Sequence, residues 1–233
     1  MRLYIIRHAD PDYENNTITP AGHLEAQALA SRMAKEGLTH LYCSSMGRAK
    51  DTARYTANQI GTEPVVEDWA CEISDCYYHH GERRFSVWDM PAEIVRGQAP
   101  FHTLEHWEKI DPSAAPVIQE RFKIVGRCSD EFVARHGYQR DGGRYRIVKP
   151  NKDRIAFVCH NGIALFWLAH LLEIPPTLLW AGIWHAPSSV TTVLFEERSG
   201  EWAVPRAISV GDVSHLYAAG LPVRPRGIIA NFD

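Results

Sequence analysis

The stretch LYIIRHAD, residues 3–10, decides the fold, because a short apolar run leads directly into a basic pair and a polar loop. Residues 3–6 are aromatic, branched and apolar, which is typical of a buried β-strand. Arg7 and His8 follow at the point where such a strand ends. In open α/β sheets, ligands bind outside the carboxyl ends of the strands. We therefore expect Arg7 and His8 to lie at a ligand-binding edge.

Working outward from this stretch, strand and helix patterns alternate. Thr19-Pro20 predicts a helix start, with Thr19 as N-cap, and Gly37 predicts its end. A second helix is expected after Ser44 or Ser45, either of which can cap it. A third helix is predicted over 162–172. The predicted further strands are 38–43, 64–67, 155–159, 190–195 and 202–208. This alternation predicts an α/β fold, a three-layer sandwich with a mostly parallel central sheet.

Residues 73–150 interrupt the alternation with a segment rich in Trp, His, Tyr, Gly and Pro. It contains one clear helix pattern, over 116–136, and a hairpin pattern over 138–148 that turns at Asp141-Gly142-Gly143. We interpret the chain as a single domain, 1–233, with a cap insertion at about 73–150 that lies over the ligand-binding edge.

Composition excludes several classes of function. The net charge of −3 argues against a nucleic-acid partner, which demands a basic surface. No apolar run approaches the roughly 20 residues of a membrane span, so no membrane partner is expected. The five cysteines are odd in number and scattered, which favours a reducing cytoplasm over a disulfide framework.

Two other strand ends resemble the first. His160 and Asn161 follow the strand 155–159, and Arg48 enters the helix after the strand 38–43. Two histidines and two arginines at one sheet edge suit a phosphate dianion, because guanidinium groups and helix N-termini both donate to phosphate oxygens. The sequence thus predicts a phosphate site.

A histidine in such a site can attack phosphorus if its ring is neutral. Arg7 and Arg48 should keep His8 neutral by charge repulsion. The leaving oxygen needs a proton from a carboxylic acid. Glu72, just after the third strand, is the first candidate for this donor, and Asp75 is the next.

These motifs, in this order, resemble those of the histidine phosphatase superfamily, which is also called phosphoglycerate mutase-like. The resemblance covers roughly 1–70 and 150–210. Ala9 replaces the usual glycine, Asp10 stands where Glu or Gln is common, and the asparagine that often follows is shifted to Asn15 or Asn16. The matching motifs are Arg7-His8-Ala9, Thr19-Pro20-Ala21-Gly22 with Gln27-Ala28, Ser44 through Ala53, and His160-Asn161-Gly162.

The resemblance implies hydrolysis of a small phosphorylated metabolite through a phosphohistidine. His8 is the implied nucleophile and Glu72 the implied proton donor. Arg7, Arg48 and His160 are implied ligands of the phosphoryl group, and Asn161 is grouped with them. No metal or cofactor is expected, because arginines supply the positive charge. Sugar phosphates, nucleotide-derived phosphates and phosphorylated proteins all remain open as substrates.

Alternatives to this function come from other classes. A phosphoglycerate mutase is disfavoured because the run Glu72-Ile73-Ser74-Asp75-Cys76 lacks the Glu-Arg-His-Tyr-Gly stretch of family mutases. A non-catalytic phosphate- or protein-binding module need not keep a nucleophile.

The insertion also carries residues with two interpretations. Cys71, Cys76, His79 and His80 have spacings that zinc permits, but no second Cys or His pair follows. Aromatic residues of this region either line a pocket or pack the insertion onto its domain, and His185 is interpreted as structural. The aromatic residues are Trp69, Tyr77, Tyr78, Trp88, Phe101 and Trp107.

Overall fold

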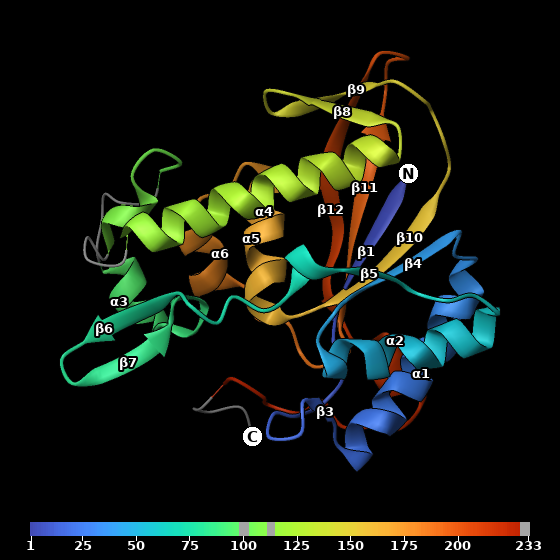
Figure 1. Ribbon diagram of the computed structural model, residues 1–233, viewed down its shortest axis with the longest axis horizontal. Helices are drawn as coiled ribbons and strands as arrows, with labels where there is room; N and C mark the ends of the chain where they lie inside the picture. The colour runs from blue at the N-terminus through green and yellow to red at the C-terminus, as the bar shows by residue number, and fades with distance from the viewer. Residues whose placement is uncertain (98–102, 111–114, 229–233) are drawn as a thin grey trace.

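The computed structural model describes residues 1–97, 103–110 and 115–228, which fold around one eight-stranded sheet (Figure 1). Phe101 lies outside the described residues. The strands follow the spatial order β5 (Val65–Glu67), β4 (His40–Ser44), β10 (Arg154–Cys159), β1 (Arg2–Arg7), β11 (Val190–Glu197), β12 (Trp202–Asp212), β9 (Arg144–Ile147) and β8 (Tyr138–Asp141).

The core of the sheet is parallel, as predicted. Strands β5, β4, β10 and β1 run in one direction, whereas β11, β12, β9 and β8 extend the sheet through antiparallel pairs. Arg7 pairs with Cys159 at the carboxyl ends of β1 and β10. His8 and His160, the next residues of each strand, therefore emerge side by side at the same edge.

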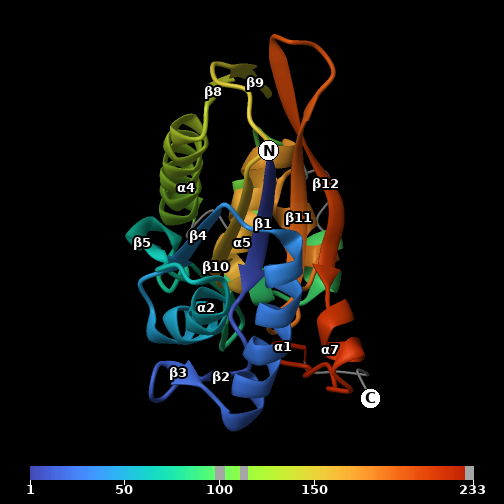
Figure 2. The same cartoon turned by 90° about the vertical axis from the view of Figure 1, so that its right-hand side faces the viewer.

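Helices cover both faces and complete the predicted three-layer sandwich (Figures 1 and 2). The first group is α1 (Pro20–Glu36), α2 (Gly47–Ile60) and the short α7 (Ser214–Ala218) beside α1. The second group is α4 (Ala115–Arg135), α5 (Asn161–Leu172) and α6 (Pro176–Gly182). Side chains along β1 point alternately to the two faces of the sheet. Leu3 and Ile5 pack in the core beneath the second group of helices, and Tyr4 and Ile6 pack in the core beneath the first group.

The helix ends test the predicted caps. The Thr19 hydroxyl accepts from Gly22 N at 3.1 Å, and Gly37 ends α1 with φ +68°, so both predictions for α1 are confirmed. The predicted Ser44 or Ser45 cap of α2 is wrong. Met46 is the N-cap residue, and Ser44 Oγ instead accepts from the Met46 N–H at 3.2 Å, outside the helix.

The insertion divides into two parts. Helix α4 packs on α5, and the hairpin β8–β9 joins the central sheet beside β12. The remaining part consists of β6 (Tyr77–His80), β7 (Arg83–Ser86), the 3₁₀ turns η2 (Val87–Asp89) and η3 (Trp107–Ile110), and α3 (Ala92–Arg96). The short elements β2 (Pro11–Asp12), β3 (Thr17–Ile18) and η1 (Asp68–Ala70) complete the described chain.

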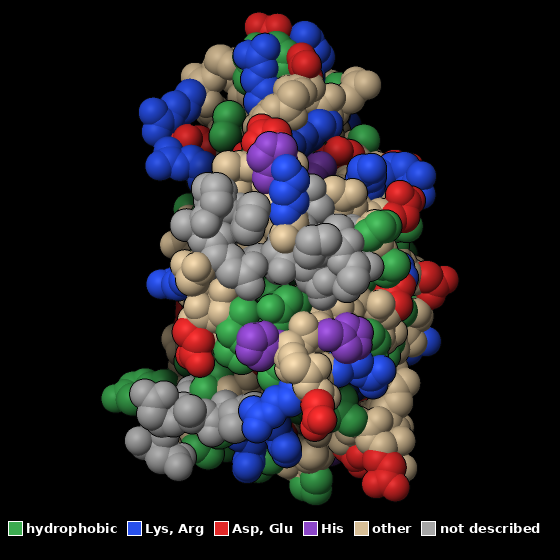
Figure 3. Space-filling view, turned by 90° about the vertical axis from the view of Figure 1, so that its left-hand side faces the viewer, with side chains coloured by type: hydrophobic (Ala, Val, Ile, Leu, Met, Phe, Trp, Pro, Cys, Tyr) green, Lys and Arg blue, Asp and Glu red, His purple; other side chains and the backbone are tan. Residues whose placement is uncertain are grey.

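The surface gives two further observations. None of the helices in the described part of the chain is both long and apolar enough to cross a membrane. Basic and acidic side chains are interspersed on the face that Figure 3 shows.

Candidate active site

His8 lies directly beyond β1 with its ring held in one orientation. Its backbone N–H donates to the Cys159 carbonyl at 2.9 Å, and its ring Nδ1–H donates to the Ala9 carbonyl at 2.8 Å. A carbonyl only accepts, so this contact fixes the proton of the neutral ring on Nδ1. Nε2 is then left with a lone pair, which is the state that a nucleophile needs.

Helix α2 holds the backbone beside this ring. Ala9 N–H donates to Thr52 Oγ1 at 3.0 Å, and the Thr52 hydroxyl donates to the Arg48 carbonyl at 2.8 Å. The Arg-Ala-x-x-Thr motif thus connects the first and second strand ends through one buried hydroxyl.

His160 stands beside His8 with a ring-centroid separation of 5.1 Å. Its Nε2 lies 2.9 Å from Ser44 Oγ, which comes from the end of the neighbouring strand β4. Burial first, and then the charges around His8, hold the pKa of His160 well below its usual value. Both histidines are therefore neutral at physiological pH.

Arg7, at the end of β1, and Arg48, in the first turn of α2, bring positive charge to this pair. Arg7 Nη1 donates to the His185 carbonyl, and Arg48 Nη1 donates to Asn16 Oδ1 at 3.1 Å. Burial is the largest cause that keeps the pKa of His8 well below its usual value, and the two guanidinium groups add to it. This agrees with the predicted repulsion.

Three buried nitrogen atoms around the histidines have no hydrogen-bond partner among the described residues. They are Arg7 Nε, Arg48 Nε and His160 Nδ1. Buried polar groups are almost always paired in a folded protein, so unpaired nitrogen atoms at the end of β1, in the first turn of α2 and directly after β10 favour an anion-binding site.

Glu72 lies at the N-terminus of α5. Its Oε2 accepts from Gly162 N at 3.1 Å, and its Oε1 accepts from Ile163 N at 3.0 Å and from Ile73 N at 3.1 Å. Burial raises the pKa of this carboxyl group above its usual value, although the three N–H groups favour the anion. Gly162 permits this contact, because a Cβ there would lie 2.7 Å from Glu72 Oε1 and 2.6 Å from a Trp88 ring carbon.

Asp75, the second candidate for the proton donor, forms an ion pair away from the two histidines. Asp75 pairs with Arg121 of α4. Burial opposes ionisation of Asp75, but this guanidinium outweighs it and lowers the pKa of the carboxyl group. The structure brings Glu72 to the site and leaves Asp75 outside the cavity.

Cys71, Cys76, His79 and His80 do not form a cluster that could bind zinc in the described structure. Cys71 Sγ lies 3.1 Å from Ser45 Oγ, whereas His79 and His80 are exposed on β6. Across the described ranges, the one group of His, Cys, Asp and Glu ligand atoms that approach one another within 4.8 Å lies elsewhere in the molecule.

A cavity of about 400 Å³ opens onto this edge, with walls that extend well beyond the predicted residues. Of the predicted set, Arg7, Arg48, Glu72 and Asn161 line it. The walls that the sequence did not assign come from the loop after β1, from the insertion and from the C-terminal part of the chain. These lining residues are Tyr13, Ser86, Asp89, Met90, Trp180, Ile183, Trp184, Arg226, Gly227 and Ile228. Among the predicted aromatics, Trp88 lines the cavity, while Trp69 and Trp107 pack in the core.

The C-terminal segment is tied across this edge by Arg226. Its Nε donates to Asp10 Oδ1 at 2.6 Å, and its carbonyl accepts from Trp184 Nε1 at 3.0 Å and from Arg7 Nη1 at 3.3 Å. This wall of the cavity depends on a contact between Arg226 and Asp10, which lie far apart in the sequence. No local sequence signal predicts such a contact.

The sheet order and the paired histidines place the chain in the phosphoglycerate mutase-like class of α/β proteins. Within that class it belongs to the histidine phosphatase superfamily (branch 1), which it matches over residues 3–206. The resemblance predicted from the motifs is therefore confirmed.

Individual relatives are distant. The chain is 25% identical over 189 residues to the adenosylcobalamin/α-ribazole phosphatase of Salmonella typhi, covering 77% of this chain and 84% of that one. A putative phosphoserine phosphatase 2 of Hydrogenobacter thermophilus is 32% identical over 82 residues, 31% of this chain and 40% of that one. The phosphoserine complex of a phosphoserine phosphatase mutant from Entamoeba histolytica superimposes with a TM-score of 0.60 at 18% identity, over 92% and 98% of the two chains, which shows the shared fold.

Proposed function

We propose that this chain hydrolyses phosphomonoesters of small metabolites through a phosphohistidine at His8. The observation that carries the proposal is the Nδ1–H contact to the Ala9 carbonyl, which leaves Nε2 as the attacking atom beside two guanidinium groups. Nucleophilic catalysis by histidine needs a neutral ring that is oriented by a partner on its other nitrogen.

The reaction has two steps. In the first, His8 Nε2 forms a bond to phosphorus, the bond to the leaving oxygen breaks, and that oxygen takes a proton from Glu72. In the second, water attacks the phosphohistidine, Glu72 takes back a proton, and inorganic phosphate leaves with His8 neutral again. Glu72 Oε2 accepts only one backbone N–H, so it is the oxygen that we assign to carry the proton.

The phosphoryl oxygens are held by Arg7, Arg48, His160 and Asn161. The unpaired Nε atoms of both arginines and Nδ1 of His160 supply donors for them. This cationic set stabilises the charge of the transferring group without a metal ion. An arriving phosphate dianion also raises the pKa of Glu72 further, which favours its acid form.

The substrate is a small metabolite with a ring or an apolar face. A cavity of about 400 Å³ fits such a molecule, and Trp88, Trp180 and Trp184 offer flat apolar walls beyond the phosphate. The relatives include phosphatases named for α-ribazole compounds and for phosphoserine. All five cysteines are free, which suits the cytoplasmic location that we propose.

Trapping of the intermediate tests this function. The protein is mixed with a radiolabelled phosphomonoester, quenched in alkali, in which phosphohistidine survives, and digested to locate the label. We expect label on His8, and His8→Ala should lose both label and turnover by at least about 10⁴-fold while retaining its circular dichroism. Turnover without labelled His8 would reject the mechanism, and transfer of label to a sugar hydroxyl in place of water would favour a mutase.

A further inference from the structure

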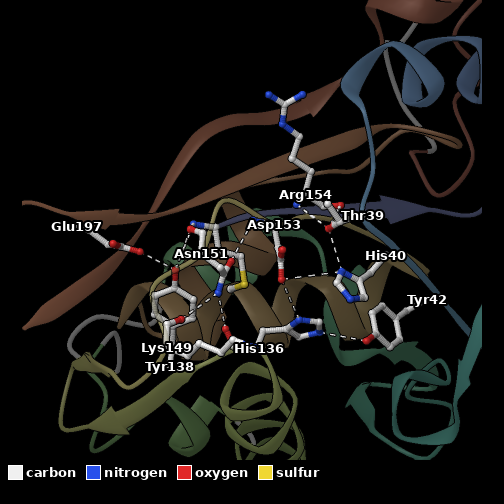
Figure 4. Close-up of polar contacts among 11 residues, drawn as sticks. Thr39, His40, Tyr42, His136, Tyr138, Lys149, Asn151, Asp153, Arg154 and Glu197 are labelled. Carbon is white, nitrogen blue, oxygen red and sulfur yellow. Dashed lines mark hydrogen bonds and ion pairs between the residues drawn. The ribbon is translucent and has the colours of Figure 1, made fainter. Parts of the chain in front are cut away.

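His40, His136 and Asp153 form a side-chain cluster at the amino-terminal edge of the sheet, opposite the candidate active site (Figure 4). Asp153 Oδ2 lies 3.8 Å from His136 Nδ1 and 4.0 Å from His40 Nδ1. The two imidazole rings meet edge to face with centroids 4.9 Å apart. The three residues come from the start of β4, the residue after α4 and the residue before β10.

His136 is held in place with its Nδ1 directed at the carboxylate. Its Nε2 lies 3.1 Å from Tyr42 Oη, and its carbonyl accepts from Asn151 Nδ2 at 2.7 Å. The ring is 7% exposed and packs on Phe132 at 5.1 Å. Histidines that bind metals donate the second ring N–H to an oxygen acceptor, which is the role that Tyr42 Oη fills here.

Asp153 and His40 complete the cluster from neighbouring strands. Asp153 N–H donates to Asn151 Oδ1 at 3.0 Å, and its carbonyl accepts from Arg2 N–H at 2.8 Å, so the backbone that carries the carboxylate is fixed. The adjacent Arg154 guanidinium points away, toward the Glu36 carbonyl, and does not compete for the carboxylate (Figure 4). The side chain of His40 is 42% exposed, and its Nδ1 lies 2.9 Å from Thr39 Oγ1.

We propose that His40, His136 and Asp153 bind a divalent transition-metal ion, with zinc the best match. Two imidazole nitrogens and one carboxylate oxygen form a donor set that zinc takes in proteins, with water at the open positions. Ligand atoms around a tetrahedral zinc lie about 3.3 Å apart, given bond lengths of about 2.0–2.1 Å. The ligand atoms, which all lie within 4.8 Å of one another, must therefore contract by less than about 1.5 Å. The His40 ring would make most of that movement, and its Nδ1 would exchange the contact with Thr39 Oγ1 for the ion.

The ion would stabilise the fold without taking part in turnover. It joins the C-terminus of α4 to the starts of β4 and β10, whereas Ser44 and His160 lie at the far ends of those strands. A ligand that binds only the folded state raises the free energy of unfolding. We therefore expect zinc to raise the melting temperature and to leave phosphatase activity unchanged, and this inference does not depend on the proposed function.

Calorimetric titration of chelator-treated protein with zinc chloride tests the site. We expect one zinc per chain, with affinity lowered at least about ten-fold by His40→Ala, by Asp153→Asn and by Tyr42→Phe, which keeps the ring but removes the oxygen that contacts His136 Nε2. At a zinc concentration about 100 times Kd, the melting temperature should rise by about 5–10 °C. His79→Ala is the matched control, since His79 is an exposed histidine outside the cluster, and it should bind zinc normally.

The same titration can overturn the proposal. Absence of saturable binding would do so, as would zinc binding that His40→Ala and Asp153→Asn leave unchanged. Binding that disappears in His8→Ala but survives in His40→Ala would assign the zinc to the candidate active site instead. A melting temperature that zinc leaves unaltered would remove the stabilising role.

Discussion

At the scale of single residues, two opposing effects act on the pKa of the Glu72 carboxyl group. Burial favours its acid form, and three backbone N–H groups favour its anion. Burial is the larger influence, so the pKa of Glu72 lies above its usual value, and this favours the acid form that the proposed proton donor needs.

The proton-donor role of Glu72 predicts a dependence on the leaving group. Glu72→Gln should slow phosphorylation of His8 by about 10²–10⁴-fold with alkyl phosphates, whose alkoxides are strongly basic. With nitrophenyl phosphate the loss should be much smaller, since nitrophenolate leaves without a proton. Rapid-quench measurement of phosphohistidine formation isolates this step from dephosphorylation. Equal losses for both esters would reject Glu72 as the acid, and Asp75→Asn serves as the control that should leave both rates intact.

At the scale of elements, the C-terminal segment around Arg226 closes one wall of the cavity. Asp10 is 1% exposed and depends on the Arg226 guanidinium for its charge partner, and Gly227 and Ile228 line the cavity beyond it. The contact between Arg226 and Asp10 therefore positions the C-terminal segment as a wall of the cavity, and we assign it no part in the chemical steps.

Arg226→Ala should therefore raise KM by about ten-fold, which corresponds to about 1.4 kcal/mol of lost binding, with a smaller effect on kcat. Steady-state kinetics with a small phosphomonoester measure both constants. Arg224→Ala is a matched control on the same segment, because the Arg224 guanidinium lies 3.9 Å from Glu25 and is not among the residues that line the cavity. A change in kcat alone, with KM preserved, would contradict a positioning role.

Local patterns were sufficient for the elements that carry the histidines. Strand β1, the ends of α1 and the turn into α5 follow from short signals: an apolar run, a Thr-Pro start, and a histidine before Asn-Gly. No helix is predicted from the sequence over 176–182, where the structure has α6 with Pro176 in its first turn. Whether a proline ends one helix or begins the next depends on packing that local sequence does not contain.

The rest of the site is assembled by contacts between distant segments. Trp88, Trp184 and Arg226 reach the cavity from the insertion and from the two loops of the C-terminal part, and none carries a motif. The Gly-Gly turn predicts the hairpin β8–β9. Its pairing with β12 depends on which strand lies at the edge of the sheet, and the local sequence does not contain that information. Sequence periodicity specifies strands, whereas tertiary packing chooses their neighbours.

At the scale of the whole molecule, buried neutral histidines couple stability to pH. His185 and His215 are 3% and 5% exposed, and burial lowers the pKa of each to about 4. His8 and His160 are shifted in the same direction. In the unfolded chain these residues take protons near pH 6.5, while the folded chain does not, so the free energy of unfolding falls as pH drops from about 6.5 toward 4.

Thermal melts between pH 7 and 4.5 should show this loss as a falling melting temperature. Glu25, whose pKa burial raises to about 7, acts in the opposite sense, and so does Glu72, but the histidines outnumber them. His215→Gln should reduce the slope by up to about 1.4 kcal/mol per pH unit, the contribution of one proton. His79→Ala, at an exposed site, should leave the slope unaltered, and a flat melting temperature in the native protein would contradict the coupling.

Treatment with EDTA should affect the melting temperature and the turnover rate differently. Because the proposed mechanism uses guanidinium groups in place of a metal, turnover at 25 °C should survive EDTA within about two-fold, even where the melting temperature falls. Activity and thermal melts on the same chelated sample measure both. Loss of turnover that zinc or magnesium restores would overturn the metal-free mechanism.

The position of β1 in the middle of the sheet has a kinetic consequence. Its two neighbours are β10 and β11, so the strand that presents His8 finds its partners only about 150 and 190 residues further along the chain. Contacts of such long sequence separation form slowly, because a large loop must close before any of them is gained. During refolding from denaturant, helical signal should therefore return well before catalytic competence. On the ribosome, His8 would spend most of synthesis on a strand without neighbours, and the candidate active site would form as one of the last events of folding.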